Sequence, residues 1–271
     1  MPEAELGDLV LHYEDRGDPG ARALLLIAGI PAIADDWSSL AEPLSASRRV
    51  IAYDNRGSGA SSVTPGPYTM AQLAADGIGL LDALEIDRAA VCGFSLGGMV
   101  AQELALEAPE RVERLILGCT HAGLAHAARQ SRETERAFVA NPDDWGARMR
   151  ALAPLAFSER IDPEQLEHFI AKKSADVQDN EGYDAQIAAV LGHDTYQRLP
   201  RIACPTLVVT GDADKVIPGA SSDVLAERIP GARLHVIEDA GHLFFLEQPA
   251  ETLELFEAFL DDRPPRLRRE R

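Results

Sequence analysis

The sequence predicts an α/β fold with a mostly parallel central sheet and helices on both faces. Short apolar runs alternate with segments of helical periodicity along much of the 271 residues, which is typical of parallel strands connected by helices. The run RALLLIA at 22–28 is apolar after its first residue, as expected for a strand buried on both faces. With 46% hydrophobic residues, the chain is large enough to bury such a core.

The elements follow one another in a regular order along the first half of the chain. LVLHYED is expected to be a strand of an edge hairpin, and Thr69 is expected to cap a helix that ends at Ala83. The loop DNRGSGASS carries Asp54 and Arg56, which we expect to brace the turn as a charged pair, with ligand binding as the alternative. The other predicted elements here are strands at 22–28, 49–54, 88–93 and 111–119, a short helix at 35–44, and a helix that begins at Ser95.

A helical insertion is predicted in the second half of the chain. Residues 124–201 are rich in Ala, Arg, Glu and Gln and lack a strand run, which indicates an inserted helical cap between core segments 1–123 and 202–262. A cap over the carboxyl edge of the sheet would bound a pocket and exclude water. The Arg-rich tail at 263–271 is expected to be solvated and disordered. The large apolar residues of the cap are expected mostly to hold its own helices together, and an unspecified part of them to face the substrate: Phe138, Trp145, Met149, Leu152, Phe157, Phe169 and Leu191.

The stretch RAAVCGFSLGG contains the strongest functional signal. An apolar run ends at Gly93, Ser95 stands between Gly93 and Gly97, and helix-forming residues follow. The pattern G-x-S-x-G is typical of a sharp strand-to-helix turn that pushes a serine out above the sheet. We interpret Ser95 as a nucleophile, and the N–H of Leu96 lies where negative charge would collect during attack on a carbonyl.

The glycines around Ser95 could also have a purely structural or a phosphate-binding role. Small residues around a serine occur where a helix simply packs tightly on a strand. The apolar run before the turn and the amphipathic helix after it favour the nucleophile. A phosphate-binding loop is excluded because neither G-x-x-x-x-G-K-[ST] nor G-x-G-x-x-G occurs.

An acid and a base follow at the ends of later strands. Asp212 and Asp214 lie just past the strand in PTLVVTGD, and the pattern G-x-x-D before Val-Ile-Pro favours Asp214, with Asp212 as the second candidate. His242 follows the last predicted strand in EDAGH and is the expected general base, with His121 as the second candidate. The order Ser95, Asp214, His242 is the chain order of α/β-hydrolases.

A second backbone donor is expected in the loop after the strand at 22–28. The chain turns there through Gly29, Ile30 and Pro31, and proline has no N–H, so Ile30 is the candidate donor. The alternative is an ordinary loop, because nothing in the sequence fixes where this N–H points.

Composition excludes several functions. A formal net charge of -18 would repel the phosphates of nucleic acids. The apolar run ALLLIAGIPAIA is too short to span a bilayer and the acidic N-terminus is unlike a signal peptide, so we expect a soluble cytoplasmic protein that does not act on membranes. The three cysteines, Cys92, Cys119 and Cys204, lie in or beside apolar runs and are expected to be packed thiols without disulfides or a metal site.

These motifs resemble the α/β-hydrolase superfamily over essentially the whole chain, from RALLLIAGIP through DNRGSGAS and GFSLGG to TGDADKVIP and EDAGHLFFLEQP. Within it, the segment from PGPYTMAQ at 65 to LIL at 117 resembles the 3-oxoadipate enol-lactone hydrolase branch and its esterase relatives. Many relatives have His-Gly in the first oxyanion loop. This chain has Ala28-Gly29, which removes a side chain that would brace the loop.

The predicted activity is hydrolysis of a carboxylic ester or lactone through an acyl-enzyme, without a cofactor or metal. Ser95 attacks, His242 transfers the proton, Asp214 orients the imidazole, and the N–H groups of Ile30 and Leu96 hold the oxyanion. A serine at this turn argues against the dehalogenase and epoxide hydrolase branches, which use aspartate there. Two alternatives are a carbon-carbon bond hydrolase on the same triad and a low-turnover ligand receptor of the same fold.

The charge of the substrate is a separate prediction. An acidic protein repels a carboxylate at long range unless local arginines reverse the field at the pocket. We expect a neutral, fairly apolar ester or lactone. The arginines that would overturn this expectation cluster in the first half of the predicted cap: Arg129, Arg132, Arg136, Arg148, Arg150 and Arg160.

Overall fold

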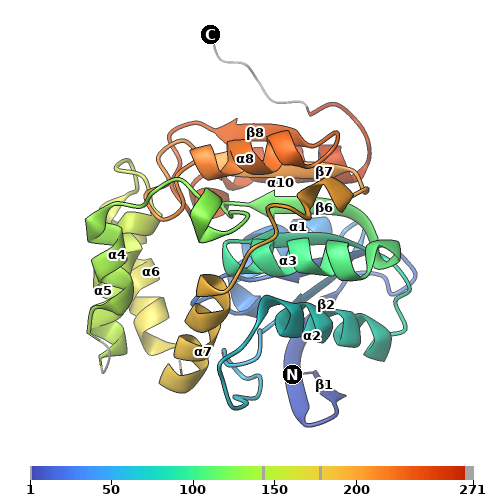
Figure 1. Cartoon of the computed structure of the whole chain (residues 1–271), viewed down its shortest axis with the longest axis horizontal. Helices are drawn as coiled ribbons and strands as arrows, with labels where there is room; N and C mark the ends of the chain where they lie inside the picture. The colour runs from blue at the N-terminus through green and yellow to red at the C-terminus, as the bar shows by residue number, and fades with distance from the viewer. Residues whose placement is uncertain (1, 142–143, 177–178, 266–271) are drawn as a thin grey trace.

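The central element of the protein is one eight-stranded sheet, seen in a computed structural model that describes residues 2–141, 144–176 and 179–265 (Figure 1). The strands are β1 (Glu3–Leu6), β2 (Leu9–Arg16), β3 (Ala23–Ile27), β4 (Arg49–Tyr53), β5 (Ala89–Phe94), β6 (Val112–Gly118), β7 (Thr206–Gly211) and β8 (Arg233–Ile237). Their order in the sheet is β1-β2-β4-β3-β5-β6-β7-β8. β1 and β2 form an antiparallel hairpin at one edge, β2 pairs antiparallel with β4, and the remaining pairs are parallel. The predicted mostly parallel sheet is confirmed.

Helices connect the strands. Those outside the β6–β7 connection are α1 (Ser38–Leu44), α2 (Met70–Ala83), α3 (Leu96–Glu107), α8 (Ala220–Arg228), α9 (Phe244–Glu247) and α10 (Pro249–Leu260). The Thr69 side chain accepts a hydrogen bond from the N–H of Gln72 at 3.1 Å, so α2 begins and ends where the sequence predicts. The expected helix at 35–44 is instead a 3₁₀ turn, Ala34–Trp37, followed by α1.

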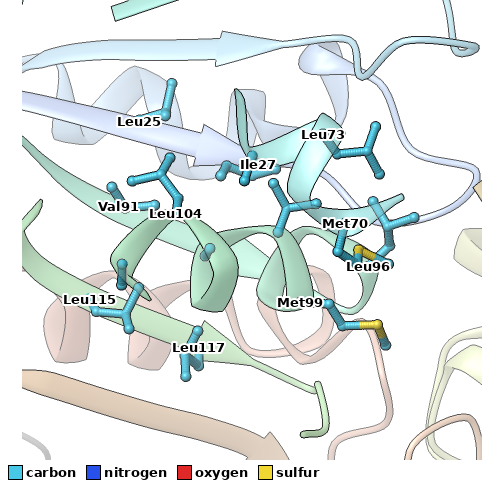
Figure 2. Close-up of a cluster of buried hydrophobic side chains, with 14 of the residues drawn as sticks. Leu25, Ile27, Met70, Leu73, Val91, Leu96, Met99, Leu104, Leu115 and Leu117 are labelled. Atoms are coloured by element: carbon cyan, nitrogen blue, oxygen red, sulfur yellow. The ribbon is translucent and has the colours of Figure 1, made fainter. Parts of the chain in front are cut away.

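The sheet has a hydrophobic core on each face because successive residues of a strand point to opposite sides. Leu25 and Ile27 of β3 pack with α2, α3 and α8, whereas Leu24 and Leu26 pack with α1 and α10. Figure 2 shows part of the first core, in which strand residues meet Leu73 of α2 and Leu104 of α3. Every residue of β3 is buried, which explains its nearly continuous apolar sequence.

In the described part of the β6–β7 connection there are four α-helices: α4 (Arg132–Val139), α5 (Trp145–Ala156), α6 (Pro163–Ala175) and α7 (Asn180–Leu191). They gather beside one end of the sheet (Figure 1). The chain leaves and rejoins the core at one place, where Gly123 bridges Asp194 and the N–H of Thr195 donates to the carbonyl of Ala122 at 2.9 Å. We call residues 124–201 the insertion. It stays a prediction that residues 124 and 201 are the boundaries of a separate cap.

Charged residues in the loop after β4 do not pair as expected. Asp54 accepts from the N–H groups of Ala34 and Ala60, whereas Arg56 pairs with Asp76. The prediction that Asp54 and Arg56 form a charged pair was wrong. Asp54 accepts from backbone N–H groups instead, and Arg56 forms its ion pair with a residue of α2.

The C-terminal tail was expected to be disordered from residue 263. Arg263 pairs with Glu254 at 2.7 Å, so the first tail residue is held against α10. Residues 266–271 lie outside the described part of the chain.

None of the helices in the described ranges combines the length and the apolar character that crossing a bilayer requires.

Candidate active site

Ser95 occupies the turn between β5 and α3 in a strained backbone conformation. Its φ and ψ are 55° and -120°, in a region where a non-glycine residue costs about 1–3 kcal/mol. The turn is possible only with small neighbours, because a Cβ on Gly93 would lie 2.0 Å from the carbonyl oxygen of Gly97, and one on Gly97 would lie 2.0 Å from that of Ile27. The N–H of Ser95 donates to the carbonyl of Gly118 at 2.9 Å, which helps to hold the turn.

Two backbone N–H groups beside Ser95 are free to donate. Within the described ranges, neither the N–H of Leu96 nor that of Ile30 bonds to another protein group. Leu96 is the first residue of α3, where N–H groups have no partner inside the helix and the helix dipole is positive. The loop of Ile30 passes close to the serine, since a Cβ on Gly29 would lie 3.0 Å from the Ser95 Cβ.

The loop of Ile30 is braced by the strand-end residues of β4, without a histidine at position 28. Asn55 donates its side-chain amide to the carbonyl of Ala28 at 3.0 Å. Asp54 accepts from the N–H of Ala34 at 2.7 Å, which fixes the far side of the loop. Two neighbouring side chains therefore supply bracing that Ala28 cannot.

His242 and Asp214 form a buried hydrogen-bonded pair. The His242 Nδ1 lies 2.8 Å from Asp214 Oδ2, and the other carboxylate oxygen accepts from the N–H groups of Val216 and Ile217, each at 2.8 Å. The side chain of Asp214 is fully buried, and that of His242 is 9% exposed. Three donors thus hold one carboxylate in place against the imidazole.

The surroundings of the His242 imidazole stabilise its protonated form more than water would. Burial works to lower the pKa of His242, but the adjacent charge of Asp214 and its hydrogen bond outweigh burial, and the pKa is raised above its ordinary value of 6.5. Cys119 also contacts this pair. Because burial raises the pKa of its thiol, Cys119 remains protonated at neutral pH.

Ser95 and His242 meet at one pocket of about 100 Å³. Ser95 lines this pocket, and its hydroxyl makes no hydrogen bond to any residue that the structure describes, the His242 imidazole included. Hydrogen bonds between a catalytic hydroxyl and its base are often long in the absence of substrate and shorten in the complex. The loop residue Ile30 lines the same pocket.

The second candidates of the sequence lie elsewhere. Asp212 is exposed and accepts only a long hydrogen bond, 3.3 Å, from the N–H of Ala240. His121 does not line the Ser95 pocket but a neighbouring cavity, and its Nδ1 accepts from the N–H of Gly123. Burial lowers the pKa of His121 to about 4, so its ring is neutral at pH 7.

The wall of the pocket is mostly apolar and comes from both the core and the insertion. Of the apolar insertion residues that the sequence singled out, Phe138, Met149, Leu152 and Phe169 line it, whereas Trp145, Phe157 and Leu191 do not. The core contributes aromatic rings, among them Trp37, Phe94 and Phe245. The ring centroids of Trp37 and Phe94 lie 4.6 Å apart.

One ion pair is set into this apolar wall. Lys173 of α6 and Asp36 of the Ala34–Trp37 turn both line the pocket and pair with each other, and Lys173 also pairs with Asp176 at 2.7 Å. The Lys173 side chain is only 3% exposed. Asp36 also pairs at 3.5 Å with Lys172, which in turn pairs with Asp35 at 2.8 Å. Two ammonium groups thus face three carboxylates, so this part of the wall carries no unbalanced positive charge.

None of the cap arginines reaches this pocket. Arg129, Arg132, Arg136, Arg150 and Arg160 are exposed, and Arg148 is buried inside the insertion over the ring of Tyr183, 4.5 Å from its centroid. Arg160 pairs with Asp239 at the surface. The arginines therefore do not form a carboxylate-binding lining.

The described residues contain one group of His, Cys, Asp or Glu side chains close enough to share a metal ion. Its members are Cys119, Asp214 and His242, whose ligand atoms lie within 4.8 Å of one another. Asp214 and His242 already satisfy each other by a hydrogen bond, so the geometry of the pair is explained without an ion.

Three residues at this site were not predicted from the sequence. Cys119 follows β6 directly, and because Phe94 of β5 pairs with Gly118 of β6, Cys119 lies at the same strand edge as Ser95. Its position after a buried strand was a signal, as it was for Asp214. Lys173 and Asp36 gave no signal, because their pairing depends on how α6 lies against the core.

Fold and site together define the class of the protein: an α/β protein with a serine on a sharp strand-to-helix turn, followed in chain order by an aspartate and a histidine that are hydrogen-bonded to each other. The model of the Alpha/beta hydrolase family matches residues 24–255. The chain therefore belongs to the α/β-hydrolase family.

Individual relatives agree with this assignment. The chain is 34% identical over 245 residues to 3-oxoadipate enol-lactonase 2 of Acinetobacter baylyi, covering 89% of this chain and 90% of that one. It is 33% identical over 253 residues to a putative carbamate hydrolase RutD of Azorhizobium caulinodans, covering 92% and 94%. The crystal structure of the enol-lactonase from Burkholderia xenovorans LB400 superposes with a TM-score of 0.86 at 31% identity, covering 96% of this chain and 100% of that one.

Proposed function

We propose that the protein is a serine hydrolase that cleaves a neutral carboxylic ester or lactone through an acyl-enzyme. The observation that carries the proposal is the buried His242–Asp214 hydrogen bond at the edge of a pocket that Ser95 also lines. A histidine oriented in this way next to a serine is the arrangement that activates a hydroxyl for attack. Hydrolysis of small-molecule esters or lactones also agrees with the enol-lactonases to which the chain is similar.

Each step of the proposed reaction has a residue to perform it. The Ser95 oxygen attacks the carbonyl carbon while the Nε2 of His242 accepts the hydroxyl proton, and Asp214 stabilises the imidazolium through Nδ1. The N–H groups of Ile30 and Leu96 donate to the carbonyl oxygen as it becomes negative. His242 then protonates the leaving alcohol. A water molecule, deprotonated by His242, attacks the acyl carbon, and the imidazolium returns that proton to the Ser95 oxygen as the acyl bond breaks, which releases the acid and free Ser95.

The charges of the pocket support a neutral substrate. Lys173 and Asp36 are the lysine and the carboxylate among the described residues that line the pocket, and they pair with each other. A second carboxylate, that of Asp176, also pairs with Lys173. A substrate carboxylate would have to compete with both acids for one ammonium, inside a protein of net charge -18. The apolar remainder of the wall fits an acyl group of hydrocarbon character.

The reaction class and the substrate charge can be tested in one experiment. A neutral short-chain aryl ester, a matched ester that carries a carboxylate, and a vinylogous diketone are offered at several salt concentrations. We expect turnover of the neutral ester with kcat/KM nearly independent of salt. The carboxylate ester should start lower and rise as salt screens the repulsion, because the Debye length falls to about 8 Å at physiological ionic strength.

Other outcomes of this experiment would contradict the proposal. A carboxylate ester that is preferred at low salt and weakened by added salt would show attraction and overturn the neutral substrate. Cleavage of the diketone in preference to either ester would replace ester hydrolysis by carbon-carbon bond hydrolysis. Binding of all three compounds without turnover would favour a receptor.

The pH dependence of kcat/KM should report His242. The imidazole must be neutral to accept the serine proton, and acidification protonates it, so kcat/KM should fall as the pH drops through the pKa of His242. Because Asp214 raises that pKa, we expect the midpoint of this fall in kcat/KM to lie above pH 6.5. The measurement is kcat/KM for the neutral ester from about pH 5 to pH 9. A flat profile across this range would argue against a histidine base.

A further inference from the structure

Glu247, at the last position of α9, connects two parts of the protein that meet at the candidate active site. Its Oε2 accepts a hydrogen bond from the N–H of Gly241 at 2.6 Å. Its Oε1 accepts from both the N–H and the hydroxyl of Ser158, at 3.0 and 2.6 Å. One carboxylate therefore holds a core loop with one oxygen and the insertion with the other.

Both of these segments bear directly on the site. Gly241 immediately precedes His242, and Ser158 follows two residues after α5 ends, in the link from α5 to α6. Each of those two helices supplies residues to the pocket wall, such as Met149 and Lys173. The bonds of Glu247 thus run from the backbone of the histidine loop to the connection between two pocket-lining helices.

The two segments also touch through their backbones. The N–H of Leu243 donates to the carbonyl of Ala156 at 2.9 Å. A Cβ on Gly241 would lie 2.6 Å from the backbone carbon of Phe157, so only glycine permits this approach. His242 is therefore flanked on both sides by residues that contact the insertion.

The bonding of Glu247 indicates a role in position rather than in charge balance. No cation among the described residues pairs with it, and its three hydrogen-bond donors are neutral groups. Such charge-assisted bonds are short and directional, and here they join segments that are 89 and 6 residues away from Glu247 in the chain. Glu247 makes no hydrogen bond to the His242 ring or to Asp214.

We propose that Glu247 is a positioning residue that sets the His242 loop against the insertion, so that the imidazole faces Ser95 while its Nδ1 remains on Asp214. This rests on the proposed function of His242 as the base. It follows that the insertion does more than enclose substrate: its α5–α6 link fixes the base through one carboxylate. Displacement of that link displaces His242.

The test is Glu247→Gln, with Glu251→Gln as the matched control. An amide has one acceptor oxygen and one NH2 donor, at almost unchanged volume, so in either orientation one of the two backbone N–H groups, that of Gly241 or that of Ser158, faces a donor and loses its acceptor. Glu251 lies in the first turn of α10 and pairs at 3.0 Å with His235, away from the pocket. Four readouts are compared. Three are taken below the melting temperature: kcat and KM for the neutral ester, the rate at which a fluorophosphonate labels Ser95, and the low-field proton NMR signal of the His242 Nδ1–H. The fourth is the melting temperature itself.

We expect Glu247→Gln to lower kcat and the labelling rate by about 10-fold to 100-fold, the cost of misplacing a reacting group by up to 1 Å. KM should stay unchanged, and the Nδ1–H signal should shift or broaden. Glu251→Gln should match the wild type in all four readouts. Ser158→Ala, which removes one of the two bonds to the insertion, should show the same pattern with a smaller loss.

Two results would overturn the proposal. One is a Glu247→Gln protein with wild-type kcat, labelling rate and Nδ1–H signal. The other is a loss of activity that follows the loss of folded protein, with an unchanged signal from the folded fraction. Failure of the proposed function is separate: if even the wild type hydrolyses no ester, the NMR signal still reports whether Glu247 positions His242.

Discussion

Replacing Ser95 by alanine should lower kcat for a neutral aryl ester by about 10⁶-fold, the scale of loss when the nucleophile of a serine hydrolase is removed. The turn leaves no substitute hydroxyl in the same place, because Ser95 is the residue that its strained backbone and the flanking glycines project toward the pocket. Alanine removes one oxygen and should leave the fold intact. The measurement is kcat by steady-state kinetics, with enzyme concentrations raised for the variant.

The control for this substitution is Ser47→Ala, an exposed serine beyond the end of α1, which should keep wild-type kcat. If the Ser95→Ala protein kept a large fraction of the wild-type activity, another group would have to attack the carbonyl. Cys119 would be the first suspect, since its side chain lines the same pocket and contacts the His242–Asp214 pair.

Asp214→Asn should lower kcat by about 10⁴-fold while the protein still folds. The amide is nearly the same size as the carboxylate but carries no charge to stabilise the imidazolium that forms when Ser95 attacks. It can also donate to Nδ1 and hold the ring in the wrong tautomer. The pKa of His242 should fall in this variant, because the charge that raises it is gone. Steady-state kinetics and the pH profile of the remaining activity measure both effects.

Asp212→Asn is the matched control for this variant, because Asp212 lies two residues away but is exposed and contacts neither His242 nor Ser95. Its kcat should change little. If Asp212→Asn were the more damaging of the two, the assignment of Asp214 as the acid would be wrong.

The strands and the local turns could be predicted from the sequence because their causes are local. A strand buried on both faces, such as β3, has to be apolar throughout, and a serine turn without room for side chains has to carry glycines at 93 and 97. Placing Asp214 and His242 at strand ends was sufficient to expect them at one edge, since parallel strands end together. The structure hydrogen-bonds these two residues to each other.

Interactions between distant segments could not be predicted. The pairing of Lys173 with Asp36 depends on the angle at which α6 lies against the core, and no periodicity of either segment encodes that angle. The bonds of Glu247 depend in the same way on where the α5–α6 link passes. The charged-pair expectation for Asp54 and Arg56 was wrong for a related reason: neighbours in sequence were chosen as partners, whereas Arg56 pairs with Asp76 of α2.

Ser95 should carry the acyl group during turnover, and mass spectrometry of the quenched enzyme tests this central claim most directly. The protein is mixed with an aryl ester whose acyl group leaves slowly, acidified within the first turnovers, and digested. We predict one added acyl group, located on the peptide that contains Ser95 and absent from Ser95→Ala. An acyl group on Cys119, or turnover of the ester with no acylated protein at any time, would contradict the claim.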